Sequence, residues 1–73
     1  MLFRSNVTYR LTADITARQK RQPVTLRQGD VIKIMKLDSD TANAKLISLS
    51  ADPKDRHLLT ANKVDVALNS ETY

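Results

Sequence analysis

The sequence predicts an all-β fold, a small antiparallel barrel of five short strands. Apolar and polar residues alternate clearly near the N-terminus, and several short apolar runs are separated by turn-forming residues. No segment carries the 10 to 15 residues of helical apolar period that a full helix needs. Five short strands in about 65 residues suit a small β-barrel. We therefore expect 73 residues to form a single domain, with the barrel over residues 7–68 and flexible ends at 1–5 and 69–73.

The first predicted strand covers residues 7–17, where apolar and polar side chains alternate. A period of two is that of a strand with one buried face, so Tyr9 is expected to face the core and Arg10 the solvent. Residues 18–23 are wholly polar and end in Pro23, which predicts an exposed loop or hairpin tip.

The second and third strands are predicted to form an antiparallel hairpin. Val24 and Leu26 precede a turn at residues 28–30, in which Gly29, the only glycine, suits a positive φ angle. Residues 31–37 carry apolar side chains on both faces, which indicates a central strand. The polar connection at 38–43 is short enough for a hairpin with a third strand over 44–51.

The C-terminal third is predicted to contain two more strands. Residues 52–55 indicate a turn, and Leu58 and Leu59 a short fourth strand. Residues 60–63 are expected to form one tight helical turn. Alternation at residues 64–68 then predicts the fifth strand, and 69–73 a frayed polar tail.

Two segments resemble the SH3-like small β-barrel superfamily. Residues 24–34 carry two spaced apolar residues, a polar gap, Gly29-Asp30 and an apolar strand, and residues 60–66 resemble the short turn before the last SH3 strand. The resemblance implies a five-stranded barrel with a long loop between Tyr9 and Pro23. SH3 peptide grooves are paved with aromatic residues. Lys63 stands where the groove tyrosine is expected, so binding of proline-rich peptides is not implied.

The composition excludes several kinds of site. The chain has no cysteine, one histidine and one glycine, which excludes disulfides, thiolate or multi-histidine metal sites and glycine-rich phosphate loops. Asp38, Asp40 and Asn43 suggest calcium, but the required EF-hand positions hold Ala42, Asn43 and Leu49. We expect neither a cofactor nor a metal.

Catalysis is not expected either. His57 is the one side chain whose ordinary pKa suits a general base near neutral pH. It would need Ser48 or Ser50 as nucleophile and Asp52 or Asp55 as the orienting acid, but no nucleophile-elbow motif is present. The sequence therefore predicts a non-catalytic binding module.

The positive charge lies in the N-terminal third. The formal net charge is +4, and residues 1–27 hold six bases against one acid. Such asymmetry favours an anionic partner. The candidate nucleic-acid-binding residues are Arg10, Arg18, Lys20, Arg21 and Arg27. Because aromatic residues for base stacking are lacking, we expect contacts to the backbone with little sequence preference.

Three other interpretations remain open. The basic loop can serve solubility alone. The protein can be an adaptor or an oligomeric building block that pairs through its edge strands. An Sm-like RNA ring is less favoured because no N-terminal helix is evident. No apolar run approaches the roughly 20 residues of a membrane helix and no signal peptide is visible, so we expect a cytoplasmic protein without membrane contact.

Overall fold

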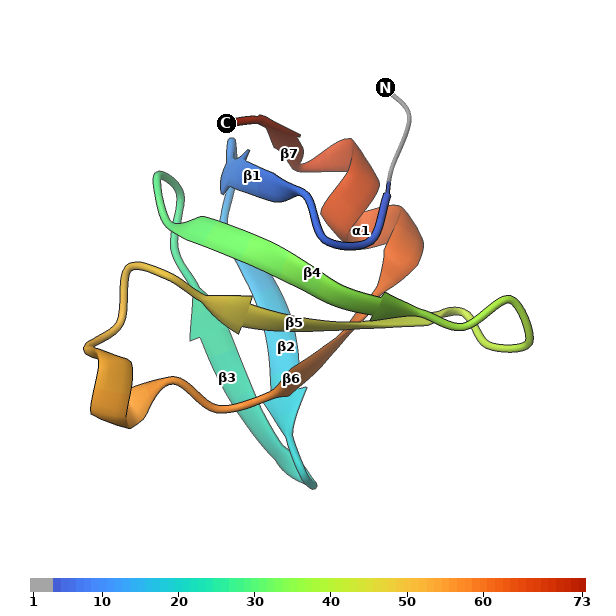
Figure 1. Ribbon diagram of the computed structural model, residues 1–73, viewed down its shortest axis with the longest axis horizontal. Coiled ribbons are helices and arrows are strands. Elements are labelled where there is room, and N and C mark those ends of the chain that lie inside the picture. The colour runs from blue at the N-terminus through green and yellow to red at the C-terminus, as the bar shows by residue number, and fades with distance from the viewer. Residues whose placement is uncertain (1–3) are drawn as a thin grey trace.

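The computed structural model describes residues 4–73 and has an all-β fold with short helical segments (Figure 1). The all-β class predicted from the sequence is confirmed. The described elements are β1 (Thr8–Leu11), β2 (Ile15–Gln19), β3 (Gln22–Leu26), β4 (Val31–Leu37), β5 (Asn43–Ser48), the 3₁₀ helix η1 (Pro53–Asp55), β6 (Leu59–Asn62), α1 (Lys63–Leu68) and β7 (Ser70–Thr72).

The strands form one antiparallel sheet in the order β3-β2-β6-β5-β4-β1-β7. β3 and β7 are its edges, so the sheet wraps around the core without closing (Figure 1). The five-stranded barrel predicted from the sequence is not confirmed. β4 lies between β5 and β1 and forms a hairpin with β5, which confirms the prediction of a central strand.

The first predicted strand is two strands with a corner between them. Burial alternates from Tyr9 to Ala17, yet the chain leaves the sheet ladder at residues 12–14. There the N–H of Thr12 donates to the carbonyl of Asn69 at 2.8 Å, and Asp14 accepts from the N–H of Gln28 at 2.7 Å. The prediction of one strand over 7–17 was wrong. Buried and exposed side chains continue to alternate through the corner, so the pattern gives no sign that a strand ends there.

The helix and the strand predicted near the C-terminus are exchanged. Residues 59–62 are strand β6, and residues 64–68, expected as a strand, lie in α1. The side-chain oxygen of Asn62 accepts from the N–H groups of Val64 and Asp65, at 2.9 and 3.3 Å, and so caps the helix. Only Val66 of α1 is buried, so the alternation of apolar and polar residues at 64–68 does not mark the buried face of a strand.

Both ends of the described chain join the sheet. Ser70–Thr72 pair with β1 as β7, where the sequence predicts a frayed tail. Near the N-terminus, the N–H of Arg4 donates to the hydroxyl of Tyr9 at 2.9 Å, and that of Asn6 to the carbonyl of Ile34 at 2.7 Å. Of the flexible segment predicted at 1–5, residues 1–3 lie outside the described part of the chain.

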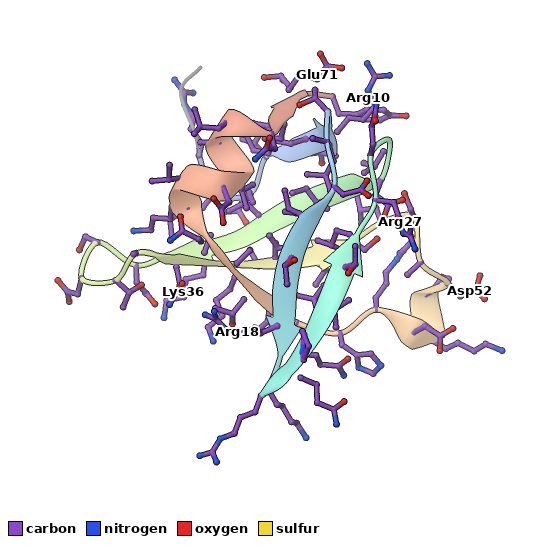
Figure 2. The ribbon with its side chains drawn as sticks, turned by 180° about the vertical axis from the view of Figure 1, so that it is seen from behind. Arg10, Arg18, Arg27, Lys36, Asp52 and Glu71 are labelled. Carbon is purple, nitrogen blue, oxygen red and sulfur yellow. The ribbon has the colours of Figure 1, made fainter. Side chains whose placement is uncertain are left out.

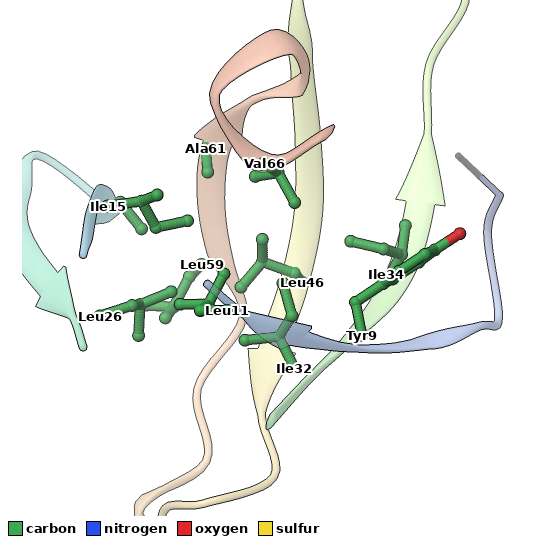
Figure 3. Packing of buried hydrophobic residues seen from close by; sticks show 11 residues of the cluster. Tyr9, Leu11, Ile15, Leu26, Ile32, Ile34, Leu46, Leu59, Ala61 and Val66 are labelled. Atoms are coloured by element: carbon green, nitrogen blue, oxygen red, sulfur yellow. The ribbon is translucent and has the colours of Figure 1, made fainter. Parts of the chain in front are cut away.

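The core consists of side chains from the inner faces of β1 to β6 and from α1 (Figure 3). It holds Tyr9, Leu11, Ile15, Ala17, Leu26, Ile32, Ile34, Leu46, Leu59, Ala61 and Val66. Burial of one such aliphatic side chain stabilises the fold by about 1.5–3 kcal/mol. Within residues 4–73, no helix is both long and apolar enough to cross a bilayer.

Gly29 provides the backbone conformation that leads from β3 into β4. Its φ is +92°, as the sequence predicts, and its N–H donates to the carbonyl of Leu11 at 2.8 Å. A Cβ at this position would meet no atom within 4 Å, so a substitution would strain only the backbone. We expect Gly29→Ala to lower the free energy of unfolding by about 1–2 kcal/mol in urea denaturation.

Gly29→Asn is the matched control for this backbone effect. Asparagine tolerates positive φ better than alanine, so the larger asparagine side chain should cost less stability. A greater loss with asparagine than with alanine would contradict backbone strain as the cause.

Candidate functional site

The β2–β3 hairpin carries the basic tip predicted from the sequence. Its two strands pair along their whole length, from Ile15 opposite Leu26 to Gln19 opposite Gln22, which leaves Lys20 and Arg21 as the turn. The buried side chains of the hairpin hold it on the core, and its tip projects from the molecule (Figure 1). The prediction of an exposed tip within residues 18–23 is thus confirmed, although the turn itself is shorter.

A row of basic residues crosses the outer face of the sheet beside this hairpin. Arg18 of β2 lies opposite Thr60 of β6, and Thr60 lies opposite Lys45 of β5. Lys45 in turn lies opposite Lys36 of β4. With neighbouring strands about 4.8 Å apart, the row spans roughly 15 Å from Arg18 to Lys36. Lys33 of β4 adds a fourth cation on the same face, opposite Ile47.

The strands that carry this row contain no acidic residue. Neither aspartate nor glutamate occurs in β2 to β6, and the four cations stand at half-buried or exposed positions beside buried neighbours such as Ile34 and Leu46. Strand alternation directs Arg18, Lys33 and Lys45 outward, and the register shift between Ile34 and Lys36 brings Lys36 to the same face. We call Arg18, Lys33, Lys36 and Lys45 the basic face, and Lys20 and Arg21 the basic tip.

Most charges of the basic face and tip are not neutralised within the protein. Arg18 reaches the side-chain oxygen of Asn43 and Lys45 the hydroxyl of Thr60, each at a long 3.4 Å. Lys36 lies 3.6 Å from a carboxylate oxygen of Asp38, an exposed ion pair of the kind that contributes little. Within residues 4–73, the side chains of Lys20, Arg21 and Lys33 form no hydrogen bond or ion pair.

Arg10 and Arg27, which the sequence places in the same candidate site, lie away from the basic face. Arg10 pairs with Glu71 of β7, with its Nε donating at 3.0 Å (Figure 2). This hydrogen bond and the charge of Glu71 raise the pKa of the Arg10 guanidinium. Figure 2 shows Arg10 at the opposite end of the molecule from the hairpin tip, and Arg27 at the base of the hairpin.

The structure thus joins part of the predicted site to residues that sequence reasoning missed. Arg18, Lys20 and Arg21 belong to one hairpin, as predicted. Lys33, Lys36 and Lys45 are the missed cations. Strand alternation alone marks Lys33 and Lys45 as outward-facing, whereas Lys36 faces outward because of the register shift that precedes it. The pairing of β2 with β6, which brings Arg18 beside them, has no local signal in the sequence.

A cleft of about 290 Å³ opens on the other side of the hairpin, between β3 and residues 48–57. Ser48, Ser50, Asp55 and His57 line it, so the residues considered for a catalytic triad come together except for Asp52, which is not part of the lining. The Ser50 hydroxyl, however, accepts from the N–H of Val31 at 2.9 Å. Within residues 4–73, no hydrogen bond joins His57 to a serine or to Asp55, and no cluster of three potential metal ligands occurs.

Comparisons of the chain with protein-family models, curated proteins and solved structures found no match. What the chain can bind therefore follows from the arrangement of its own residues. A row of cations, broken at β6 by Thr60, lies on one side of the β2–β3 hairpin, and a mixed apolar and polar cleft lies on the other.

Lys20 occupies a backbone conformation that lysine seldom adopts. Its φ is +57°, in the left-handed region, which costs a residue with a Cβ about 1–2 kcal/mol. We expect Lys20→Gly to raise the free energy of unfolding by up to about 1 kcal/mol and the Tm by about 4–8 °C. Thermal unfolding followed by circular dichroism measures this change.

Arg21→Gly is the matched control, because Arg21 in the same turn has no positive φ. Glycine there only adds freedom to the unfolded chain and should lower stability by about 0.5–1 kcal/mol. Equal effects of the two substitutions would contradict strain at Lys20.

Proposed function

We propose that this protein is a non-catalytic module that binds the phosphate backbone of nucleic acid through its basic face and basic tip. The observation that carries the proposal is the row of Arg18, Lys45 and Lys36 across four strands that contain no acid. A polyanion laid along this row meets several cations at once, and their counterion release supplies the affinity.

The residues between the cations suit a sugar–phosphate chain. Thr60 and Asn43 contribute a hydroxyl and an amide beside Arg18 and Lys45, and such groups commonly contact phosphates and sugars. Arginine at the hairpin provides a fork that binds two phosphate oxygens, and the lysines provide mobile point charges.

Base recognition is not part of the proposal. The aromatic side chains within residues 4–73 are Tyr9, which is buried in the core, and Tyr73, which follows β7. Neither stands on the basic face, so this surface has no platform on which bases stack. Contacts to phosphate without base contacts give binding with little sequence preference.

The SH3-like resemblance belongs to the same proposal. We infer an SH3-like arrangement in which the β2–β3 hairpin takes the place of the long loop after the first strand. Three features support it: the Gly29-Asp30 turn before β4, the β4–β5 hairpin, and a helical segment before the last strand, β7. The seven-stranded open sheet departs from the simple barrel.

Fluorescence anisotropy with labelled duplex DNA and single-stranded DNA and RNA tests the proposal over a range of salt concentrations. For about five neutralised phosphates, the logarithm of the duplex association constant should fall with a slope of about −4 to −5 against the logarithm of salt concentration. Lys45→Glu should weaken binding by at least about tenfold, because it places an anion in the centre of the row.

Two controls separate a defined surface from net charge. Lys54→Glu makes the same charge change on the exposed η1 helix, and Arg10→Gln removes a cation that Glu71 already neutralises. Both should leave binding within about twofold of the unmodified protein. Equal losses with Lys54→Glu and Lys45→Glu, or no binding at low salt, would overturn the proposal.

Lys45→Glu, which should weaken nucleic-acid binding, should at the same time stabilise the fold. Lys36 and Lys45 lie directly opposite each other, and like charges at such positions destabilise a sheet. Lys45→Glu should therefore raise the free energy of unfolding by about 0.2–1 kcal/mol in urea denaturation. Lys33→Glu, opposite the uncharged Ile47, is the control and should stabilise less. A loss of stability with Lys45→Glu would show that the two lysines do not repel each other.

A further inference from the structure

The open side of the sheet exposes both a strand edge and a cleft. β3 is an edge strand, and residues 48–57 lie across from it with the cleft of about 290 Å³ between them (Figure 2). The apolar lining includes Val24 and Leu26 of β3 and Leu59 of β6. Leu26 and Leu59 belong to the core cluster, so the cleft opens directly onto the core.

The free edge of β3 offers backbone groups to an added strand. Gln19 and Gln22 flank the two-residue turn and form the first pair of the hairpin ladder. Because hydrogen-bonded and non-hydrogen-bonded pairs alternate from there, Pro23 and Thr25 direct their backbone groups away from β2. Pro23 has no N–H, so the edge presents the N–H of Thr25 and the carbonyls of both residues.

The opposite wall of the cleft is held in place. The Arg56 guanidinium donates to the carbonyl of Leu49 at 2.9 Å and to that of Ala51 at 3.1 Å, which ties the loop to itself. This bonding leaves the side chains of Asp55 and His57 at the cleft, where neither forms a hydrogen bond or ion pair within the described residues. Asp30 adds a second carboxylate, one oxygen of which accepts from the N–H of Arg27 at 3.0 Å, and the Arg56 guanidinium that bonds Leu49 and Ala51 also lines the cleft.

We propose that this cleft binds an extended peptide segment of a protein partner, which adds to the free edge of β3 as a further strand. An apolar side chain of the peptide would contact Val24 and Leu59, and a lysine or arginine would pair with Asp55. Because alternate residues of a strand face the same side and both contacts lie in the cleft, the segment carries its apolar and its basic residue two positions apart. This site and the basic face lie on different sides of the sheet and adjoin at the hairpin, where Gln19 and His57 of the cleft line a second hollow together with Lys20 and Lys45.

The test uses ¹⁵N-labelled protein followed by NMR and a capped synthetic peptide in which valine and lysine take turns at every second position, with threonine between them. A peptide with glutamate in place of lysine is the control. The valine–lysine peptide should shift the amide resonances of Thr25, His57 and Leu59 and should bind at least about tenfold more tightly than the control. No shift, shifts confined to the basic face, or equal binding of both peptides would overturn the proposal.

Two variants test the parts of the site separately. Asp55→Asn should weaken binding of the valine–lysine peptide, whereas Lys36→Glu at the far end of the basic face should leave it within about twofold. Thr25→Pro removes the one outward N–H without touching the β2–β3 ladder and should weaken binding by at least about tenfold, while Thr25→Ala retains it. Unchanged binding by a folded Thr25→Pro variant would overturn strand addition.

A modified peptide gives the same answer if Thr25→Pro fails to fold. N-methylation of the peptide amides that face β3 should abolish binding to the unmodified protein, and methylation of the alternate amides should not. Equal binding of both methylated peptides would overturn strand addition. Because these readouts do not involve nucleic acid, they stand apart from the test of the basic face.

Discussion

One sheet must surround the whole hydrophobic core of this protein. Residues 4–73 form no second sheet and a helix contributes only Val66 to the core cluster, so each of β1 to β6 contributes inward-facing side chains to it. Each of these strands must therefore present its other face to solvent. In β2 to β6 every charged side chain on that outer face is basic, since the acidic residues of the described chain lie in turns, in helices and in β7. The basic face is thus a consequence of how the core is enclosed.

A sheet that wraps around a core must also bend, and the bends shape both candidate sites. The register shifts between Ile34 and Lys36, and a shift of this kind re-aims the side chains that follow it. As a result, Met35 is 40% exposed and Lys36 faces Lys45 across the strands. The corner at residues 12–14 lets β2 leave β1 and pair with β6, which brings Arg18 into the row. Beyond β2 the sheet ends at β3, and its free edge borders the cleft.

The local pattern of apolar and polar residues predicted which side chains of a strand are buried. It predicted less well where each strand begins and ends and which strands pair with each other. The period of two correctly placed Tyr9 inside and Arg10 outside, but it continues through the corner and so hid the break between β1 and β2. In the C-terminal third, an asparagine followed three residues later by an acid was a signal for a helix start, and Asn62 with Asp65 fits it. The alternation of the following valines outweighed that signal. The hairpin tip was predictable because it is local, whereas the basic row depends on pairing between strands far apart in sequence.

Two of the places where this chain departs from its most stable arrangement belong to the basic tip and the basic face. Among the described residues no buried polar side-chain atom lacks a hydrogen-bond partner, so the interior contains no unsatisfied side-chain group that would lower stability. By contrast, Lys20 holds a left-handed backbone at the hairpin tip, and Lys36 opposes Lys45 in the row beside it. These two features are physically independent, since one is backbone strain and the other is charge repulsion. A bound polyanion would relieve the repulsion and would use the cation that the strained turn projects. Binding of a phosphate backbone, as proposed above, would account for the presence of both features at the basic tip and the basic face.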